Sequence, residues 1–294
     1  MRYATPVAFR TALEARLLAR ARETGVAIGR LRKVVVFDRL LARLLVVAPD
    51  RWHLKGALAL DLRLREGTRS TKDMDLGRRD SEAAATEDFL AAQELDADDF
   101  FRFRVARTSA LDQLEEGSAV RYRVEAALAG RAFEQVTVDV GFSATPSPTD
   151  LVVGPDLLAF AGLEPLTIPT LSLAYHVAEK VHAFTRDYGP GRANTRVKDL
   201  VDLMLIRVIG NLTAGELRRA LTAVFADRSL QPLPVALPLP PAAWAATYQK
   251  LATEVGLSHD VIAAHALAAM FLDPVLRGGI ADTARWDPAR GQWE

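Results

Sequence analysis

The middle of the chain carries three consecutive segments in which apolar and polar residues alternate, and this pattern limits the fold more than any other feature. The segments are Phe100–Arg107, Ala119–Leu128 and Phe133–Phe142, separated by polar or glycine-containing turns. Alternation with a period of two is typical of β-strands. Helical patterns flank the cluster on both sides, so we predict an α+β fold in which helices pack on one mixed sheet.

The N-terminal flank adds two helices and further strand candidates. Residues 6–46 have apolar residues at helical spacing, with arginines between them. Residues 52–54 and 72–77 are strand-like, and a helix is predicted between them from Ala57 to Leu64. Ser81 is expected to cap the next helix.

The C-terminal flank reads as helical. Thr170 is expected to cap a helix that ends near Asp187, residues 196–209 form a second helix, and Thr213 opens a third. Residues 231–241 contain five prolines, which no helix or central strand tolerates. We expect an extended connector there, followed by two more amphipathic helices.

Length and composition agree with this division. A chain of 294 residues, half of them hydrophobic, can form two domains with a real core. We predict a sheet-bearing lobe with N-terminal helices at residues 1–165 and a helical lobe at residues 166–294.

Composition also excludes several functional classes. The chain has no cysteine, which removes thiolate zinc sites and cysteine nucleophiles. It lacks a signal-like apolar start and any apolar run near the roughly 20 residues of a membrane span, so we expect a cytoplasmic protein without membrane contact. The formal net charge is zero, so a polyanion would have to meet a local patch.

Three aspartates are the candidate metal ligands. Asp73 and Asp75 have one residue between them, and on a strand such residues face the same way, about 7 Å apart at the backbone. Asp139 interrupts a valine-rich strand, an awkward place for a carboxylate that is neither paired nor metal-bound. Mg²⁺ or Mn²⁺ held by these oxygens would serve phosphoryl chemistry. Aspartates at this spacing also occur in surface turns, calcium loops and dehalogenase-like phosphatases, and Asp139 has a solvent-facing alternative.

A small-residue turn precedes the aspartate pair. Lys55, Gly56 and Ala57 lead from a short strand into a helix. A glycine there lets a phosphate approach the amides that open the helix, where the dipole favours anions. The ordinary alternative is a turn that uses glycine only for its backbone freedom.

The helical half contains a second group of charged residues. Lys180 lies one helical turn after His176, and Lys198 lies one turn before Asp202. The Lys198–Asp202 spacing also fits a surface ion pair of little energetic consequence. The neighbouring leucines and valines favour a helix that is largely buried, with its charges facing a cleft.

Five short motifs in one order resemble the AbiEii/AbiGii nucleotidyltransferase toxins, the toxin halves of abortive-infection and MenT-type toxin–antitoxin pairs. The motifs are Lys-Gly-small, Arg-x-Thr-x-Asp-x-Asp, Val-Asp-Val-Gly-Phe, Ala-x-Lys-x-x-Ala and Lys-Asp-x-x-Asp-Leu, within residues 52–205. The resemblance implies a polymerase-β-like nucleotidyltransferase lobe and a helical lobe that closes a cleft. It also implies a nucleoside triphosphate donor, magnesium, an RNA acceptor such as the tRNA 3′ end, and an antitoxin encoded nearby.

The resemblance also assigns roles to residues. Asp73 and Asp75 match the metal-binding pair, Lys180 matches a cleft lysine that meets the triphosphate, and Asp202 matches an essential acidic position. The residues expected to bind nucleotide are Lys55, Gly56, Ala57, Thr71, Lys198 and Asp199. Many relatives carry Gly-Ser or Gly-Gly where this chain has Gly56-Ala57, so a hydroxyl contact to phosphate is expected to be missing.

Arginines suggest where RNA could lie. Arg102 and Arg104 share one face of their strand, as do Arg121 and Arg123 of the next. Phosphate contacts of this kind position a nucleic acid without reading its sequence. A solvated sheet face balanced by nearby glutamates explains the same pattern.

Two rival functions remain open from the sequence. One is a nucleotidyltransferase for a small molecule such as an aminoglycoside, and the other is a non-catalytic relative that only binds RNA or a partner protein. Walker A, dinucleotide-binding and nucleophile-elbow motifs are absent, which disfavours ATPases, Rossmann oxidoreductases and α/β-hydrolases.

Overall fold

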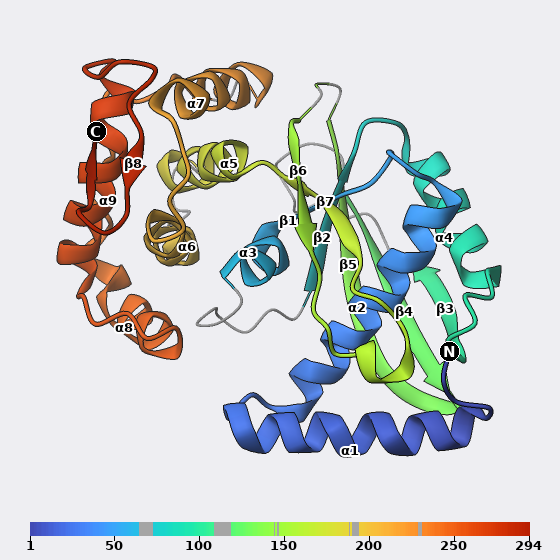
Figure 1. The fold of residues 1–294 in the computed structure, drawn as a ribbon. Coiled ribbons are helices and arrows are strands. Elements are labelled where there is room, and N and C mark those ends of the chain that lie inside the picture. The colour runs from blue at the N-terminus through green and yellow to red at the C-terminus, as the bar shows by residue number, and fades with distance from the viewer. Residues whose placement is uncertain are drawn as a thin grey trace. The chain divides into compact units, whose positions relative to one another are not determined.

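The computed structural model divides the chain into two units (Figure 1). It describes residues 1–64, 73–108, 119–143, 145, 147–187, 189, 194–228 and 231–294. Of these, unit 1 holds residues 1–62 and those from 73 to 170, whereas unit 2 holds Arg63, Leu64 and those from 171 to 294. The fold is α+β, as the sequence predicts.

Unit 1 is built on a seven-stranded mixed sheet with the order β3-β4-β5-β2-β1-β7-β6. Its strands are β1 (His53–Lys55), β2 (Asp73–Arg78), β3 (Phe101–Arg107), β4 (Ala119–Leu128), β5 (Arg131–Phe142), β6 (Thr149–Val153) and β7 (Thr167–Leu171). The three alternating segments of the sequence form β3, β4 and β5, which pair antiparallel. β2 runs parallel to β5 and antiparallel to β1. β6 and β7 were not predicted from the sequence.

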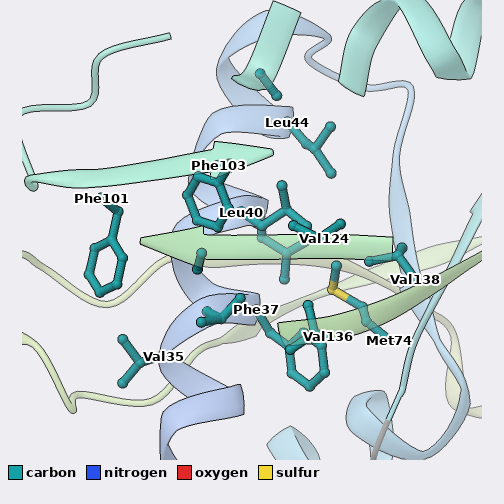
Figure 2. Packing of buried hydrophobic residues seen from close by; sticks show 14 of the residues in the cluster. Val35, Phe37, Leu40, Leu44, Met74, Phe101, Phe103, Val124, Val136 and Val138 are labelled. Atoms are coloured by element: carbon teal, nitrogen blue, oxygen red, sulfur yellow. The ribbon is translucent and has the colours of Figure 1, made fainter. Parts of the chain in front are cut away.

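One face of this sheet is apolar and carries the core of unit 1. The long helices α1 (Pro6–Thr24) and α2 (Ile28–Val47) precede the sheet, and α4 (Glu82–Glu94) follows β2. Val124, Val136 and Val138 project from the strands toward Phe37 and Leu40 of α2 (Figure 2). Burying each such side chain stabilises the fold by about 1.5–3 kcal/mol. The alternation along the strands therefore leaves the opposite face for polar residues.

A buried ion pair ties α2 to the start of β3. Arg43 and Asp99 both have side chains that are 0% exposed. The Arg43 guanidinium donates to both carboxylate oxygens of Asp99 at 2.8 and 2.7 Å, and also to the carbonyl oxygen of Phe101. Asp99 accepts a further bond from the Phe101 amide. The pair is fully hydrogen-bonded, which is the condition under which buried charges are tolerated.

The β4–β5 hairpin contains an irregularity near its turn. The register shifts between Ala126 and Ala127, so one extra residue of β5 lies opposite β4 there. On the turn side of this bulge, Arg10 of α1 donates to the carbonyl oxygens of Leu128, Arg131 and Ala132. On the other side the pairing is regular as far as Gly141.

Unit 2 is mainly helical. Its elements are α5 (Leu173–Thr185), α6 (Val197–Arg207), α7 (Ala214–Arg228), α8 (Ala245–Glu254), α9 (Val261–Leu276), the short strands β8 (Trp286–Asp287) and β9 (Gln292–Trp293), and a 3₁₀ turn at Ala242–Trp244. Phe271 of α9 stacks on Trp293 and contacts Trp286. Within the described ranges, no helix is both long and apolar enough to cross a membrane.

The predicted start of the first helix of unit 2 was wrong. Thr170 lies in β7, where its hydroxyl donates to the carbonyl oxygen of Ile168. Ser172 is the N-cap of α5, and its hydroxyl accepts from the Tyr175 amide. The β-branched Thr167, Ile168 and Thr170 favour a strand, so the serine is the first capping residue outside it. Residues 231–241 form neither helix nor strand, as their prolines predict.

Candidate active site

A row of four ionisable residues crosses the polar face of the sheet in unit 1. The strand register pairs Lys55 with Asp75, Asp75 with Asp139, and Asp139 with Arg121. Adjacent strands lie about 4.8 Å apart, so these residues are immediate neighbours on four strands. From β1 to β4 the row therefore has a cation at each end and two carboxylates between them. Asp73 lies two residues before Asp75 on the same face of β2, with Thr137 as its partner on β5.

Lys55 reaches across the row toward β5. A Cβ atom built on Gly141 of β5 would lie 2.8 Å from the Lys55 Nζ atom. That distance is too short for a real side chain, so glycine at position 141 provides the room that the lysine occupies. Lys55 belongs to β1, and β2 lies between it and β5. Its ammonium group is therefore held over the strand that carries Asp139.

Asp139 is held by Arg121 rather than left open. Nε and Nη2 of Arg121 donate to the two carboxylate oxygens, each at 2.7 Å. The Asp139 side chain is 16% exposed and the Arg121 side chain 37%. The hydrogen bonding to Asp139 is the main cause that raises the pKa of Arg121. The negative charges of Asp139, Asp73 and Asp75 raise it further by smaller amounts. The solvent-facing alternative for Asp139 does not describe this paired, partly buried carboxylate.

The donor set on this face suits a hard divalent cation. Asp73 and Asp75 are half-buried carboxylates on a rigid strand, and Mg²⁺ prefers oxygen ligands. Among the residues that the structure describes, no three or more His, Cys, Asp or Glu side chains are already gathered as a metal site. Asp73 and Asp75 could supply oxygen ligands to a metal, and Asp139 lies beside Asp75 on the neighbouring strand.

Gly56 directly follows β1 and is the first residue of α3 (Gly56–Leu64), where the sequence predicts a strand-to-helix turn. Its φ of 67° lies in the left-handed region that favours glycine. A Cβ atom here would overlap the Asp75 carboxylate, 2.7 Å from its Cγ. The space that we expected a phosphate to use is thus occupied by Asp75, which packs against the first turn of α3. Ala57, the next residue, is buried.

Unit 2 contains the second group of predicted residues. Lys180 of α5 forms ion pairs with Asp199 at 3.0 Å and Asp202 at 2.7 Å, both on α6. The three side chains are 14%, 7% and 1% exposed. Burial raises the pKa of Asp199, and Lys180 opposes that shift. Asp202 therefore does not form a surface pair with Lys198, which is exposed.

His176 is a buried residue to which the sequence assigned no role. It lies one helical turn before Lys180, and neither ring nitrogen has a hydrogen-bond partner among the described residues. Burial lowers its pKa to about 3, helped by the charge of Lys180. The ring is therefore neutral at physiological pH. The i,i+4 spacing to Lys180 was the available signal, but burial could not be predicted from it.

The structure thus gathers the predicted residues in two groups, each within its own unit. Lys55, Gly56, Asp73, Asp75 and Asp139 belong to unit 1. Lys180, Asp199 and Asp202 form one cluster in unit 2, and Lys198 lies beside it in sequence. Thr71 lies outside the described residues.

Comparison with known proteins supports the resemblance seen in the sequence. The family model described as "Nucleotidyl transferase AbiEii toxin, Type IV TA system" matches residues 39–269. A comparison with curated proteins gave no match.

Solved structures also resemble this chain. MenT4, the nucleotidyltransferase toxin Rv2826c from Mycobacterium tuberculosis H37Rv, is 21% identical with a TM-score of 0.52, over 88% of this chain and 93% of that one. JHP933 from Helicobacter pylori is 12% identical with a TM-score of 0.44, over 84% and 93%. The antibiotic-resistance factor ANT(2'')-Ia is 12% identical with a TM-score of 0.34, over 65% and 92%. The match to MenT4 supports a shared fold, and the family match spans most of the sequence: this chain belongs to the AbiEii family of nucleotidyltransferase toxins of type IV toxin–antitoxin systems.

Proposed function

We propose that this chain transfers a nucleoside monophosphate from a nucleoside triphosphate to an RNA acceptor, the tRNA 3′ end, and so blocks translation. The observation that carries the proposal is the placement of Asp73, Asp75 and Asp139 on one sheet face, with the Lys55 ammonium held over β5. Carboxylates that converge from a rigid sheet are what two-metal phosphoryl chemistry requires. Family membership adds the nucleotidyltransferase activity and an antitoxin partner.

In this reaction a hydroxyl oxygen of the acceptor loses its proton to solvent and forms a bond to the α-phosphorus. The bond from that phosphorus to the bridging oxygen breaks, and pyrophosphate leaves with the electron pair. Mg²⁺ or Mn²⁺ bound by Asp73 and Asp75 would supply charge neutralisation for the triphosphate. Lys55 is suited to bind a phosphate oxygen, because within the described part of the chain it has no ion-pair partner.

The cluster in unit 2 is proposed to present a cation to the triphosphate. Lys180 would contact phosphate oxygens, and Asp202, 2.7 Å from its ammonium nitrogen, would hold it in place. Asp199 and Lys198 complete the expected nucleotide-binding set. Lys180 lies between two buried carboxylates, so a triphosphate that binds its ammonium group must compete with Asp199 and Asp202 for it.

The decisive experiment is a transfer assay with each of four α-labelled nucleoside triphosphates and total RNA. We expect label in the tRNA fraction with the wild type and none with Asp75→Ala. Asp96→Ala is a matched control, because Asp96 is an exposed aspartate of the same unit that forms an ion pair with Arg102 on the surface. Label transferred by Asp75→Ala at the wild-type rate would overturn the proposal. If label reaches an aminoglycoside but not RNA, the RNA acceptor is rejected and the nucleotidyl transfer itself is retained.

The toxin role has its own test. Expression of the wild type is expected to slow growth, and co-expression of the product of a neighbouring gene is expected to relieve it. Asp75→Ala should grow like cells that carry an empty vector. Equal toxicity of the wild type and Asp75→Ala would separate growth arrest from nucleotidyl transfer.

A further inference from the structure

Arg121 occupies both oxygens of the third carboxylate. The guanidinium approaches Asp139 side-on, with Nε on one oxygen and Nη2 on the other. Such two-point pairs are among the stronger hydrogen-bonded ion pairs in proteins. A metal ion that recruits Asp139 must therefore displace this pair or share a carboxylate that is already neutralised.

The charges of the row make the same point. Lys55 and Arg121 at its ends balance Asp75 and Asp139 in its centre, so the four residues sum to zero. Together with Asp73, these five residues carry a net charge of minus one. Without Arg121 the same residues would carry two, and the attraction for a divalent cation would rise accordingly.

The neighbouring arginine provides an internal comparison. Arg123 lies two residues further along β4 on the same face, with uncharged Thr137 as its partner on β5. It is exposed. Arg121 and Arg123 thus carry the same charge on the same strand, but only Arg121 holds a carboxylate of the row.

We propose that Arg121 is a positioning residue that competes with the divalent cation for Asp139 and so sets how tightly this sheet face binds that cation. The inference rests on the proposed function, because it takes Asp73 and Asp75 as the metal-binding pair. In the metal-free protein Arg121 keeps Asp139 away from them. When the cation recruits Asp139, the guanidinium is released on the face where the nucleotide and RNA phosphates are expected.

The test measures Mn²⁺ binding alone, by titration calorimetry and by the loss of the free Mn²⁺ signal in electron paramagnetic resonance. Arg121→Gln removes the charge and the two-point contact with Asp139, whereas Arg121→Lys keeps the charge and removes the second contact. We expect Arg121→Gln to bind Mn²⁺ about tenfold more tightly than the wild type, or about 1.4 kcal/mol. Arg121→Lys should fall between them, and Arg123→Gln should match the wild type.

Each outcome decides a different point. Equal Mn²⁺ affinity of Arg121→Gln, Arg121→Lys and wild type would overturn the competition, as would an equal gain in Arg123→Gln, which would reflect general surface charge. If the competition is overturned but Asp75→Asn abolishes Mn²⁺ binding, Asp73 and Asp75 remain the metal-binding pair and only the role of Arg121 is rejected. If Asp75→Asn binds Mn²⁺ like the wild type, the metal pair fails and the inference fails with it. A larger rise in melting temperature on adding Mn²⁺ to Arg121→Gln or Arg121→Lys than to wild type would support the proposal independently of titration.

Discussion

Replacement of Gly56 by alanine tests whether the Asp75 carboxylate must lie against the first turn of α3. The φ of 67° at this glycine costs an L-amino acid about 1–2 kcal/mol. The added methyl group would also overlap the Asp75 side chain, 2.7 Å from its Cγ and 2.9 Å from its Cβ. Because the neighbour is an aspartate fixed on a central strand, relief requires a rotation of its side chain or a shift of the turn.

The magnitude follows from these two contributions. Overpacking of this kind typically costs about 1–3 kcal/mol. Added to the backbone cost, Gly56→Ala should lower the free energy of unfolding by about 2–5 kcal/mol. Nucleotidyl transfer should fall roughly 100-fold, the loss typical when a reacting or metal-binding group is displaced by about 1 Å.

Gly25→Ala is the matched control for backbone strain. Gly25 caps α1 with a φ of 71°, and a Cβ atom there would meet nothing within 4 Å. It should therefore show only the backbone cost, about 1–2 kcal/mol in urea unfolding, and full transfer activity. The destabilisation by Gly56→Ala should also shrink in an Asp75→Ala background, because the carboxylate is then gone.

The reasoning would be refuted if Gly56→Ala unfolded at the same urea concentration as Gly25→Ala and transferred label at the wild-type rate. Asp75 would then tolerate displacement, and its position against α3 would have no role in the reaction. An equal cost of Gly56→Ala with and without the Asp75 carboxylate would likewise reject the predicted overlap.

Three further predictions concern buried charge. Asp99→Ala leaves Arg43 charged and buried, so the free energy of unfolding should fall by about 3–5 kcal/mol in urea melts, and a loss below 1 kcal/mol would contradict the ion pair. His176 is neutral in the fold, with a pKa near 3 against 6.5 ordinarily, so the unfolded chain binds more protons and stability should fall as the pH drops from about 6.5 toward 3. His176→Leu should flatten that slope by up to about 1.4 kcal/mol per pH unit, and an unchanged slope would show that other groups cause it. Lys180→Met should destabilise by about 3–5 kcal/mol in the same melts, and a second change, Asp202→Asn, should restore part of this; the absence of any recovery would reject the pairing.

The central strands could be predicted because their pattern is local. β4 begins and ends where the alternation predicts, at Ala119 and Leu128. β6 (Thr149–Val153) and β7 (Thr167–Leu171) were missed because both are short, prolines flank β6 and Pro169 lies inside β7. Their pairing is also set by distant chain segments. For the same reason Thr170 was predicted as the N-cap of α5, whereas the structure has Ser172 in that position.

The candidate site was predictable as a set of residue types but not as a set of pairs. The aspartate spacing placed Asp73 and Asp75 on one face, and the strand register of the structure agrees. The sequence suggests that Arg121 belongs to an RNA track. Its partner Asp139 could not be identified, because the partner of a β4 residue depends on the hairpin register. For Asp202 the sequence leaves two partners open, Lys198 on its own helix and Lys180 on another, and the structure pairs it with Lys180. Sequence spacing reveals contacts within an element, and contacts between elements require the fold.

The bulge in the β4–β5 hairpin has a practical consequence. Because the register changes at Ala126 and Ala127, the turn at Ala129 and Gly130 is set independently of the regular ladder that aligns Arg121 with Asp139. A fluorophore or affinity label attached through a cysteine at Gly130 would meet nothing within 4 Å. The φ of 70° there would cost about 1–2 kcal/mol, and this strain would fall on the turn rather than on that alignment. The hairpin tip is thus a convenient handle for immobilising this toxin in single-molecule or capture experiments.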